Sequence, residues 1–294
     1  MKYIIVTGGA GFIGSNLIEK LITEDFNSTI ISLDDYSSGS KKNHIKSKRV
    51  KYIKGKTKDF EKYFLKYKDN IKTIFHFGEF SRIAQSFIKT KDCFESNIQG
   101  SYEVIKFCLT NKIRIIYSAT SATLGDEKNP HRSPYSFSKY NNLNLLINLN
   151  RWFGLQYSVV YFYNVYGGRQ IKDHFMSAVV GIFENQYKKN KFLTVVKPGS
   201  QKRNFTHVKD TIDCVLKLYK SKQNLHYAVY NKKFITIVNL AKLFSNKIKL
   251  IDQRPGERFE SKTVKSFRGI EIKQYISKTN IMKYVENFKK THKV

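Results

Sequence analysis

The chain has few of the residues that cross-link or interrupt a small protein: three cysteines, four prolines and one tryptophan among 294 residues. Cys93, Cys108 and Cys214 form no C-x-x-C pair, and His174 and His207 complete no metal-ligand spacing with them. A disulfide framework and a zinc site are therefore excluded, and we expect no metal. Each cysteine falls in a helix-like stretch, so we expect buried thiols in a reducing compartment, the cytoplasm.

Long apolar runs are also missing, and none approaches the length that crosses a bilayer. We therefore expect no membrane partner. The opening MKYIIVTGGAGFIG places a lysine before apolar residues, as a signal peptide does, but the run soon enters a glycine-rich turn. It predicts a first strand instead. A hydrophobic content of 41% over this length can fill the core of one large or two smaller domains.

Acidic residues are scarce, with 23 Asp and Glu against 53 Lys and Arg, which gives a net charge of +30. Such an excess can indicate nucleic-acid or membrane binding. Only ten of the 53 are Arg, the residue suited to bidentate phosphate and base contacts, and no run of five lysines occurs. We therefore expect no nucleic-acid partner, although the positive field would attract a small anionic ligand.

Short apolar runs alternate with helical patterns through the first half of the chain, and residues 13–21 repeat their apolar positions at helical spacing. Repeated βα units with apolar strands predict an α/β fold, a Rossmann-type doubly wound parallel sheet. We assign it to residues 1–165, rejoined by about 205–232, with a smaller C-terminal α/β substrate domain in 166–294. The last forty residues are charged and poorly periodic. The predicted strands are 3–7, 29–33, 50–54, 73–77, 114–118, 157–162, 192–196 and 226–230, and a helix is predicted at 236–244.

The stretch TGGAGFIG follows the first predicted strand and opens a helix. Glycines at this spacing let the chain turn sharply, let a pyrophosphate approach the backbone, and let the helix pack on the sheet. Asp34 ends the second strand, where its carboxylate can bind an adenosine ribose and repel a 2′-phosphate, which favours NAD over NADP. A glycine-rich turn without a ligand is the alternative. The expected contacts in this turn are Gly8, Gly11, Phe12, Ile13 and Gly14.

A second motif, Tyr135-x-x-x-Lys139, lies downstream of the hydroxyl-rich SATSATLGD at 118–126. Residues four apart share one face of a helix, so the ammonium would lie beside the phenol. Together with a positive nicotinamide, this cation would lower the pKa of Tyr135 and make it a base for a sugar hydroxyl. The spacing carries little weight alone, because the chain has 19 tyrosines.

The motifs together resemble the extended short-chain dehydrogenase/reductases that act on nucleotide sugars, in particular the UDP-galactose 4-epimerase-like enzymes. The matching stretches occur in family order from residue 4 to about 257: TGGAGFIG, LDDYSSG, HFGEFSRIAQS, NIQGS, YSATSATLGD, SPYSFSK, YNVYGGR, RNFTHVKD and RPGE. The resemblance implies NAD as cofactor, a UDP-sugar or other nucleotide sugar as substrate, and a homodimer built on helices near 84–110 and 135–153.

The resemblance also implies roles for individual residues. Thr120 and Tyr135 would contact the sugar 4-hydroxyl, and Lys139 would hold the nicotinamide ribose. Asn97 would support the active-site loop. The remaining residues fall into two groups: Phe77, Gly78 and Ser118 would line the dinucleotide, and Asn164, Arg203 and Arg254 would bind the substrate near its phosphates. Solvated surface arginines are the alternative for the last two.

Five features depart from the family pattern, and one of them is that YNKKFIT lacks the family's glycine near residue 232. Lys56 stands where a carboxylate usually contacts adenine, and Glu79 replaces a small residue near the cofactor. Leu124 replaces a common tyrosine. The closing Leu-Gly-Trp-like element is absent, so the C-terminus cannot be aligned, nor can the residue that sizes the sugar pocket be identified.

The residues after Thr120 bear on the reaction. Dehydratases of this family carry Asp-Glu directly after the catalytic Thr, and the decarboxylating relatives place a Glu in this loop, whereas here Ser121 and Ala122 follow. A site without that carboxylate can oxidise and reduce but lacks a second acid for removing water. The sequence therefore predicts an NAD-dependent C4 epimerase acting through a transient 4-keto sugar. The alternatives are a reductase or dehydratase of the same family and a non-catalytic dinucleotide-binding regulator.

Overall fold

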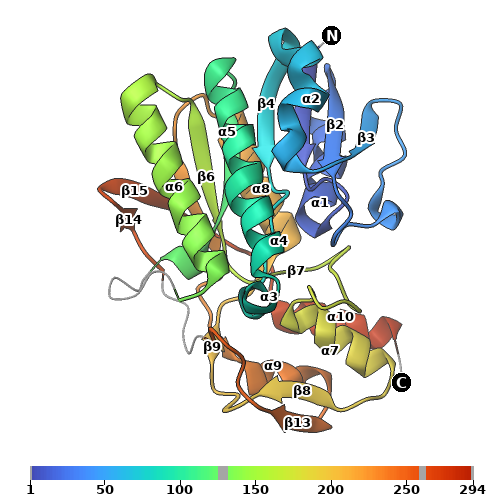
Figure 1. The fold of residues 1–294 in the computed structure, drawn as a ribbon. Coiled ribbons are helices and arrows are strands. Elements are labelled where there is room, and N and C mark those ends of the chain that lie inside the picture. The colour runs from blue at the N-terminus through green and yellow to red at the C-terminus, as the bar shows by residue number, and fades with distance from the viewer. Residues whose placement is uncertain (1, 125–131, 258–262, 293–294) are drawn as a thin grey trace.

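The computed structural model describes residues 2–124, 132–257 and 263–292. Its main feature is a nine-stranded sheet in the order β14-β15-β11-β6-β5-β4-β1-β2-β3 (Figure 1). Every neighbouring pair is parallel except β14 and β15. The strands are β1 Lys2–Thr7, β2 Ser28–Asp34, β3 Val50–Lys54, β4 Ile71–His76, β5 Ile115–Thr120, β6 Tyr157–Phe162, β11 His226–Tyr230, β14 Ser266–Phe267 and β15 Ile270–Ile276.

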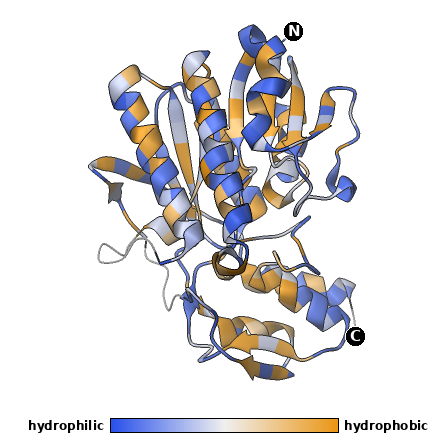
Figure 2. Cartoon of the chain, in the orientation of Figure 1, coloured by the Kyte–Doolittle hydropathy of each residue, from blue (hydrophilic) through white to orange (hydrophobic). Residues whose placement is uncertain are grey.

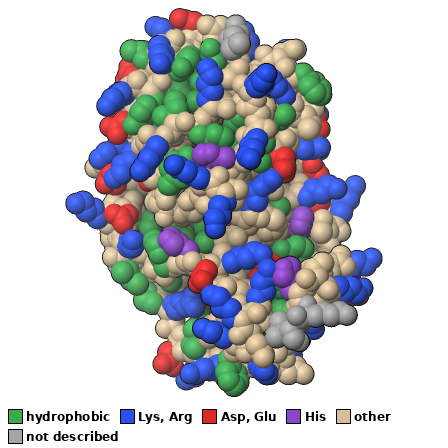
Figure 3. Space-filling model, turned by 90° about the vertical axis from the view of Figure 1, so that its right-hand side faces the viewer, with side chains coloured by type: hydrophobic (Ala, Val, Ile, Leu, Met, Phe, Trp, Pro, Cys, Tyr) green, Lys and Arg blue, Asp and Glu red, His purple; other side chains and the backbone are tan. Residues whose placement is uncertain are grey.

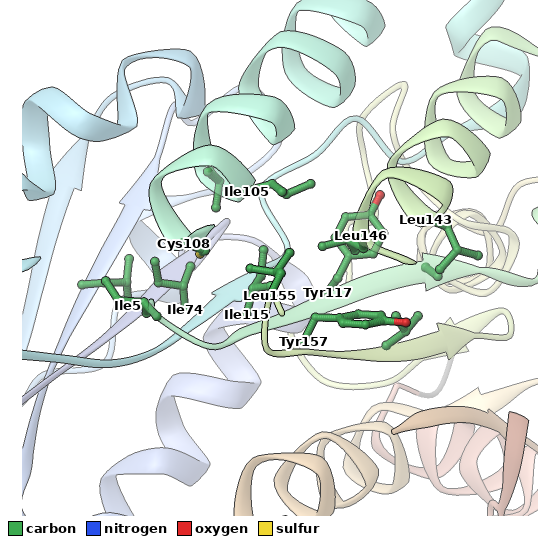
Figure 4. Close-up of a cluster of buried hydrophobic side chains, with 14 of the residues drawn as sticks. Ile5, Ile74, Ile105, Cys108, Ile115, Tyr117, Leu143, Leu146, Leu155 and Tyr157 are labelled. Atoms are coloured by element: carbon green, nitrogen blue, oxygen red, sulfur yellow. The ribbon is translucent and has the colours of Figure 1, made fainter. Parts of the chain in front are cut away.

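Both faces of this sheet are covered by helices, as the apolar strands require. Along β1 the side chains alternate: Ile5 belongs to the core beneath α5 and α6, while Ile4 and Val6 belong to the core beneath α1 and α8. Figure 4 shows the first of these cores, with strand side chains pointing toward α5 and α6. The helices are α1 Phe12–Glu24, α8 Val208–Lys220, α5 Ser101–Thr110 and α6 Pro134–Phe153, with the short α2 Phe60–Phe64 beside α5. The predicted doubly wound fold is confirmed.

The helix α6 begins at a strong local signal. Ser133 caps it, accepting a hydrogen bond from the Ser136 backbone, while the Ser136 side chain bonds back to the Ser133 backbone, and Pro134 occupies the first helical position. Gly154 ends the helix in the left-handed conformation, with φ 72°. Figure 2 shows hydrophobic and hydrophilic residues along both α5 and α6, as expected for helices that bury one side.

The single helix expected near 84–110 is divided. Lys89 takes a non-helical conformation, and the segment consists of α3 Ile83–Ile88, α4 Thr90–Phe94, a π-helical stretch Glu95–Gly100 and then α5. The π-helical stretch lies directly against α6. It brings Asn97 into the interior, fully buried.

The remaining elements form a smaller α/β unit with its own core. It holds α7 Val179–Lys188, β8 Leu193–Val196, α9 Ile237–Phe244, β13 Ile248–Ile251 and α10 Ile281–Thr291, and β8 pairs with β13 in parallel. Two short ladders connect it to the large sheet region: β7 Val165–Tyr166 with β10 Thr206–His207, and β9 Lys202–Arg203 with β12 Ile235–Thr236. The predicted smaller C-terminal unit is confirmed, and the boundaries at 165 and 166 stay a prediction.

The surface carries its charge without a concentrated patch on the face drawn in Figure 3, where Lys and Arg are spread among other side chains. All three cysteines are free thiols and buried, as expected. In the described parts of the chain, no helix is long and apolar enough to span a membrane, and no cluster of three potential metal ligands occurs.

Candidate active site

A cavity of about 850 Å³ lies at the carboxyl ends of the parallel strands, where open α/β sheets bind ligands. Its wall comes from the segments that follow β1, β2, β4 and β5, from α6, and from the smaller unit. Fifteen of the sixteen residues predicted from the sequence line it: Gly8, Gly11, Phe12, Ile13, Gly14, Asp34, Phe77, Gly78, Ser118, Thr120, Tyr135, Lys139, Asn164, Arg203 and Arg254.

Asn97 is the sixteenth, and it lies beneath the wall instead of in it. Its amide oxygen accepts the Phe80 backbone N–H at 2.6 Å, and its amide nitrogen donates to the Phe80 carbonyl at 3.0 Å and to the Ser138 hydroxyl at 3.1 Å. These bonds tie the segment after β4 to α6. Asn97 therefore supports the cavity wall without facing the cavity.

The glycine turn has the tight geometry that dinucleotide binding requires. Gly8 has φ 72°, and a Cβ at Gly14 would lie 2.2 Å from the Gly8 carbonyl oxygen. A side chain at Gly8 would also meet the backbone of Gly78 at 2.8 Å. The glycines of this turn have no side chains to cover the backbone, and α1 begins at Phe12 directly after the turn. The backbone N–H groups at the start of α1 can therefore bind a pyrophosphate. The turn fits the dinucleotide predicted from the sequence.

Asp34, the last residue of β2, lines the cavity next to the glycine turn. Its two carboxylate oxygens accept the backbone N–H of Ala10 at 2.9 Å and of Tyr36 at 2.8 Å, and the residue is 7% exposed. Burial raises the pKa of Asp34, and the two backbone bonds oppose that shift. The carboxylate is thus held beside the glycine turn, where it suits a ribose and disfavours an added phosphate.

Tyr135 projects from the first turn of α6 into the cavity and is 8% exposed. The Thr120 hydroxyl accepts the Ala122 N–H at 3.2 Å and is hydrogen-bonded to the Tyr135 phenol, which favours the ionised phenol. Burial nevertheless raises the pKa of Tyr135 to about 12. The expected lowering by Lys139 does not appear, and the charge of Arg82 favours the ionised form.

Lys139 lies on the same helix face, but its ammonium is already engaged. It forms an ion pair with Glu79 and donates to the Ser118 carbonyl, and it lies 4.5 Å from the centre of the Tyr117 ring. The side chains of Lys139 and Glu79 are 4% and 2% exposed. Burial lowers the pKa of Lys139, and Glu79 opposes that change. The expectation of a site without an added carboxylate is therefore wrong: Glu79 supplies one from the segment after β4.

On the substrate side, Asn164 adopts φ 40° and donates to the Asn204 carbonyl at 3.0 Å. Arg203 forms an ion pair with Glu257 at 3.4 Å, and Arg254 reaches the same part of the wall. Both arginines line the same cavity as the glycine turn. This placement suits the phosphates of a second nucleotide, as the resemblance implied.

Lys56 also lines the cavity, and its ammonium pairs with Glu95 at 2.7 Å, as that of Lys58 does at 2.9 Å. Sequence reasoning noted Glu79 near the cofactor but not its pairing with Lys139, and it missed Arg82 and Glu95. The position of Glu79 directly after Phe77 and Gly78 was the available signal, since a small residue is usual there. Arg82 and Glu95 gave no comparable sign.

Comparison with known proteins agrees with this geometry. The chain matches the profile of the NAD dependent epimerase/dehydratase family over residues 4–231. It is 28% identical over 281 residues to UDP-glucuronic acid decarboxylase 6 of Arabidopsis thaliana, covering 86% of this chain and 78% of that one.

Two solved structures share the fold. UDP-glucose 4-epimerase of Thermotoga maritima with UDP-glucose has a TM-score of 0.84 at 23% identity, covering 98% of this chain and 99% of that one. UDP-N-acetylglucosamine 4-epimerase of Methanobrevibacter ruminantium, in complex with UDP-N-acetylmuramic acid, has a TM-score of 0.83 at 25% identity, covering 99% and 97%. The family's dependence on NAD confirms the predicted cofactor. The chain belongs to the NAD dependent epimerase/dehydratase family of nucleotide-sugar enzymes.

Proposed function

We propose that the protein is an NAD-dependent C4 epimerase of a UDP-hexose or UDP-N-acetylhexosamine. The supporting observation is the set of groups around Tyr135: a bonded Thr120 hydroxyl, and a carboxylate, Glu79, that is fully engaged with Lys139 and its neighbours. Such a site can move one proton at a sugar hydroxyl. It offers no second free acid among the described cavity residues near Tyr135.

When bound, NAD would supply the hydride acceptor and donor. Tyr135 accepts the 4-hydroxyl proton and later returns it, and Thr120 orients that hydroxyl. Gly8 and Gly14 admit the pyrophosphate to the backbone, and Asp34 holds the adenosine ribose. Loss of that proton and of the hydride from C4 would leave a transient 4-keto sugar in the cavity. Rotation of that sugar would then present its other face before reduction.

Elimination of water needs a further acid with a free proton, and Glu79 is poorly placed to provide one. One of its oxygens pairs with Lys139, and the other accepts bonds from Ser101 at 2.9 Å, Tyr117 at 3.0 Å and Asn142 at 3.1 Å. These contacts support epimerisation over dehydration or decarboxylation.

The product profile tests this proposal. Purified protein is incubated with UDP-glucose, UDP-galactose and their N-acetyl counterparts, and the products are resolved by NMR. We expect interconversion of 4-epimers from both directions without added cofactor. Stoichiometric consumption of NAD(P)H would indicate a reductase, and binding without turnover would indicate a regulator.

The two arginines of the smaller unit should bind substrate without taking part in the chemistry. Replacing Arg203 or Arg254 with Ala removes a charge-assisted contact to diphosphate, which costs on the order of 1.5–3 kcal/mol of binding. Titration calorimetry with UDP-sugar should show weaker binding, with kcat much less affected. Arg151→Ala, an exposed arginine near the far end of α6, is the matched control. Unchanged affinity combined with lower kcat would contradict the assignment.

We also propose a homodimer formed through α5 and α6, which lie side by side on one face of the sheet (Figure 1). Tyr102 is 51% exposed on α5 and Phe137 is 37% exposed on α6, a large aromatic area for a free surface. Tyr102→Glu should yield a monomer at micromolar concentration by light scattering. Phe26 is also an exposed aromatic residue, but it does not belong to α5 or α6. Phe26→Glu should therefore leave the dimer intact. A monomeric wild-type protein would contradict the proposal.

A further inference from the structure

The buried pair of Glu79 and Lys139 has no account in the reaction described above. Glu79 comes from the segment after β4 and Lys139 from α6, and both side chains are nearly inaccessible to solvent. Taking two charges out of water is costly unless they are paired and hydrogen-bonded. Here every oxygen of Glu79 is satisfied, as the contacts with Ser101, Tyr117 and Asn142 show. The fold therefore holds this ion pair in a defined position in the cavity floor.

A chain of hydrogen bonds joins this pair to the glycine turn. Thr7, the last residue of β1, accepts the backbone N–H groups of residues 77–78 at 3.1 and 2.9 Å, so its own hydrogen is directed to Nδ1 of His76 at 2.8 Å. The other ring nitrogen of His76 then donates to Ser101 at 2.9 Å, and Ser101 donates to Glu79 at 2.9 Å. Burial lowers the pKa of His76 to about 4, so the ring is neutral. Glu79 is therefore fixed from the cofactor side.

The pairing also cancels the charge that Lys139 brings to the cavity floor. A lone Lys139 would place one positive charge near the nicotinamide ribose, whereas Lys139 with Glu79 carries none. The nicotinamide ring is a cation in NAD⁺ and neutral in NADH. An uncompensated ammonium would repel the oxidised form and leave the reduced form unaffected.

We propose that Glu79 is a positioning residue that neutralises Lys139 and thereby favours the oxidised form of the bound cofactor. An enzyme that must hand its hydride back in every turnover benefits from a site that prefers NAD⁺ over NADH. The inference rests on the NAD site and not on C4 epimerisation. Its failure can therefore be distinguished from failure of the proposed function.

The test is a charge cycle read by equilibrium binding. The Kd values of NAD⁺ and NADH are measured at pH 7 for nucleotide-free wild type, Glu79→Gln, Lys139→Gln and the double variant. Glu79→Gln leaves an unpaired cation, so its preference for NAD⁺ over NADH should fall, on the order of tenfold. Lys139→Gln leaves an unpaired anion, so its preference should rise by a similar factor. The double variant, again neutral, should return close to the wild-type ratio.

Tyr117→Phe is the matched control, since it removes one hydrogen bond to Glu79 and leaves both charges in place. It should leave the ratio of the two affinities unchanged. If Glu79 had only a structural role, both Glu79→Gln and the control would weaken the binding of NAD⁺ and of NADH by the same factor. That result, or a double variant that does not restore the ratio, would overturn the proposal. If one single variant does not fold, the other still tests the sign of the effect.

Discussion

Replacing Tyr135 with Phe should lower kcat by about 10²–10⁴-fold, the usual contribution of a general base, while NAD still binds. The substitution removes the phenol oxygen that contacts Thr120 and keeps the ring in its buried position. Steady-state assays give kcat, and calorimetry gives NAD affinity. Thr120→Val should cost less, because it removes a hydrogen bond and leaves the base.

The pH dependence gives the same prediction a second readout. As the proposed base, Tyr135 must be deprotonated to act, and burial raises its pKa to about 12. kcat/KM should therefore rise with pH above neutrality, and the Phe variant should lose that rise. Tyr140→Phe, on the same helix but packed against Phe267, is the control and should behave as wild type. A loss smaller than tenfold in Tyr135→Phe would exclude this tyrosine as the base.

The second large effect is expected at the glycine turn. An alanine at Gly14 would place its Cβ 2.2 Å from the Gly8 carbonyl oxygen, which is backbone and cannot move aside. We expect Gly14→Ala to lose measurable NAD binding and to lower the free energy of unfolding by on the order of 1–3 kcal/mol, as overpacking does. NAD titration and thermal unfolding measure the two effects.

Gly168→Ala provides the comparison, because no heavy atom lies within 4 Å of a Cβ at that position. It should keep both NAD affinity and stability. Wild-type NAD affinity in Gly14→Ala would show that the dinucleotide does not bind at this turn.

The elements that sequence reasoning found are those encoded by local pattern. β1 and α1 follow from an apolar run, a glycine turn and apolar residues at helical spacing, and α6 was expected near 135–153 from the resemblance. The strand β15 was missed because its residues are only partly buried and alternate with charged ones. One sequence signal was available, the glycine at position 269: Arg268 and Gly269 have φ 50° and 79°, as in the two-residue turns that join hairpin strands, and glycine favours such turns.

The cavity residues divide along the same line. Gly14 and Asp34 could be predicted from the sequence, because both belong to a local motif that is known to bind a dinucleotide. The partner of Lys139 is not readable, since Glu79 lies 60 residues earlier and meets it only when β4 and α6 converge. The ionisation of Tyr135 depends on that tertiary contact and on burial. The motif therefore predicted the position of Tyr135 in the cavity correctly and its electrostatic surroundings incorrectly, and its role as the base stays a prediction.

Transfer of the hydrogen at C4 tests the proposed reaction most directly. Wild-type protein is incubated with UDP-hexose and UDP-N-acetylhexosamine carrying deuterium at C4, and the products are examined by NMR and mass spectrometry. An epimerase removes and returns the same hydride, so we predict 4-epimers that keep deuterium at C4. Deuterium at C6 of a 4-keto-6-deoxy sugar, or its loss from the sugar, would contradict the account.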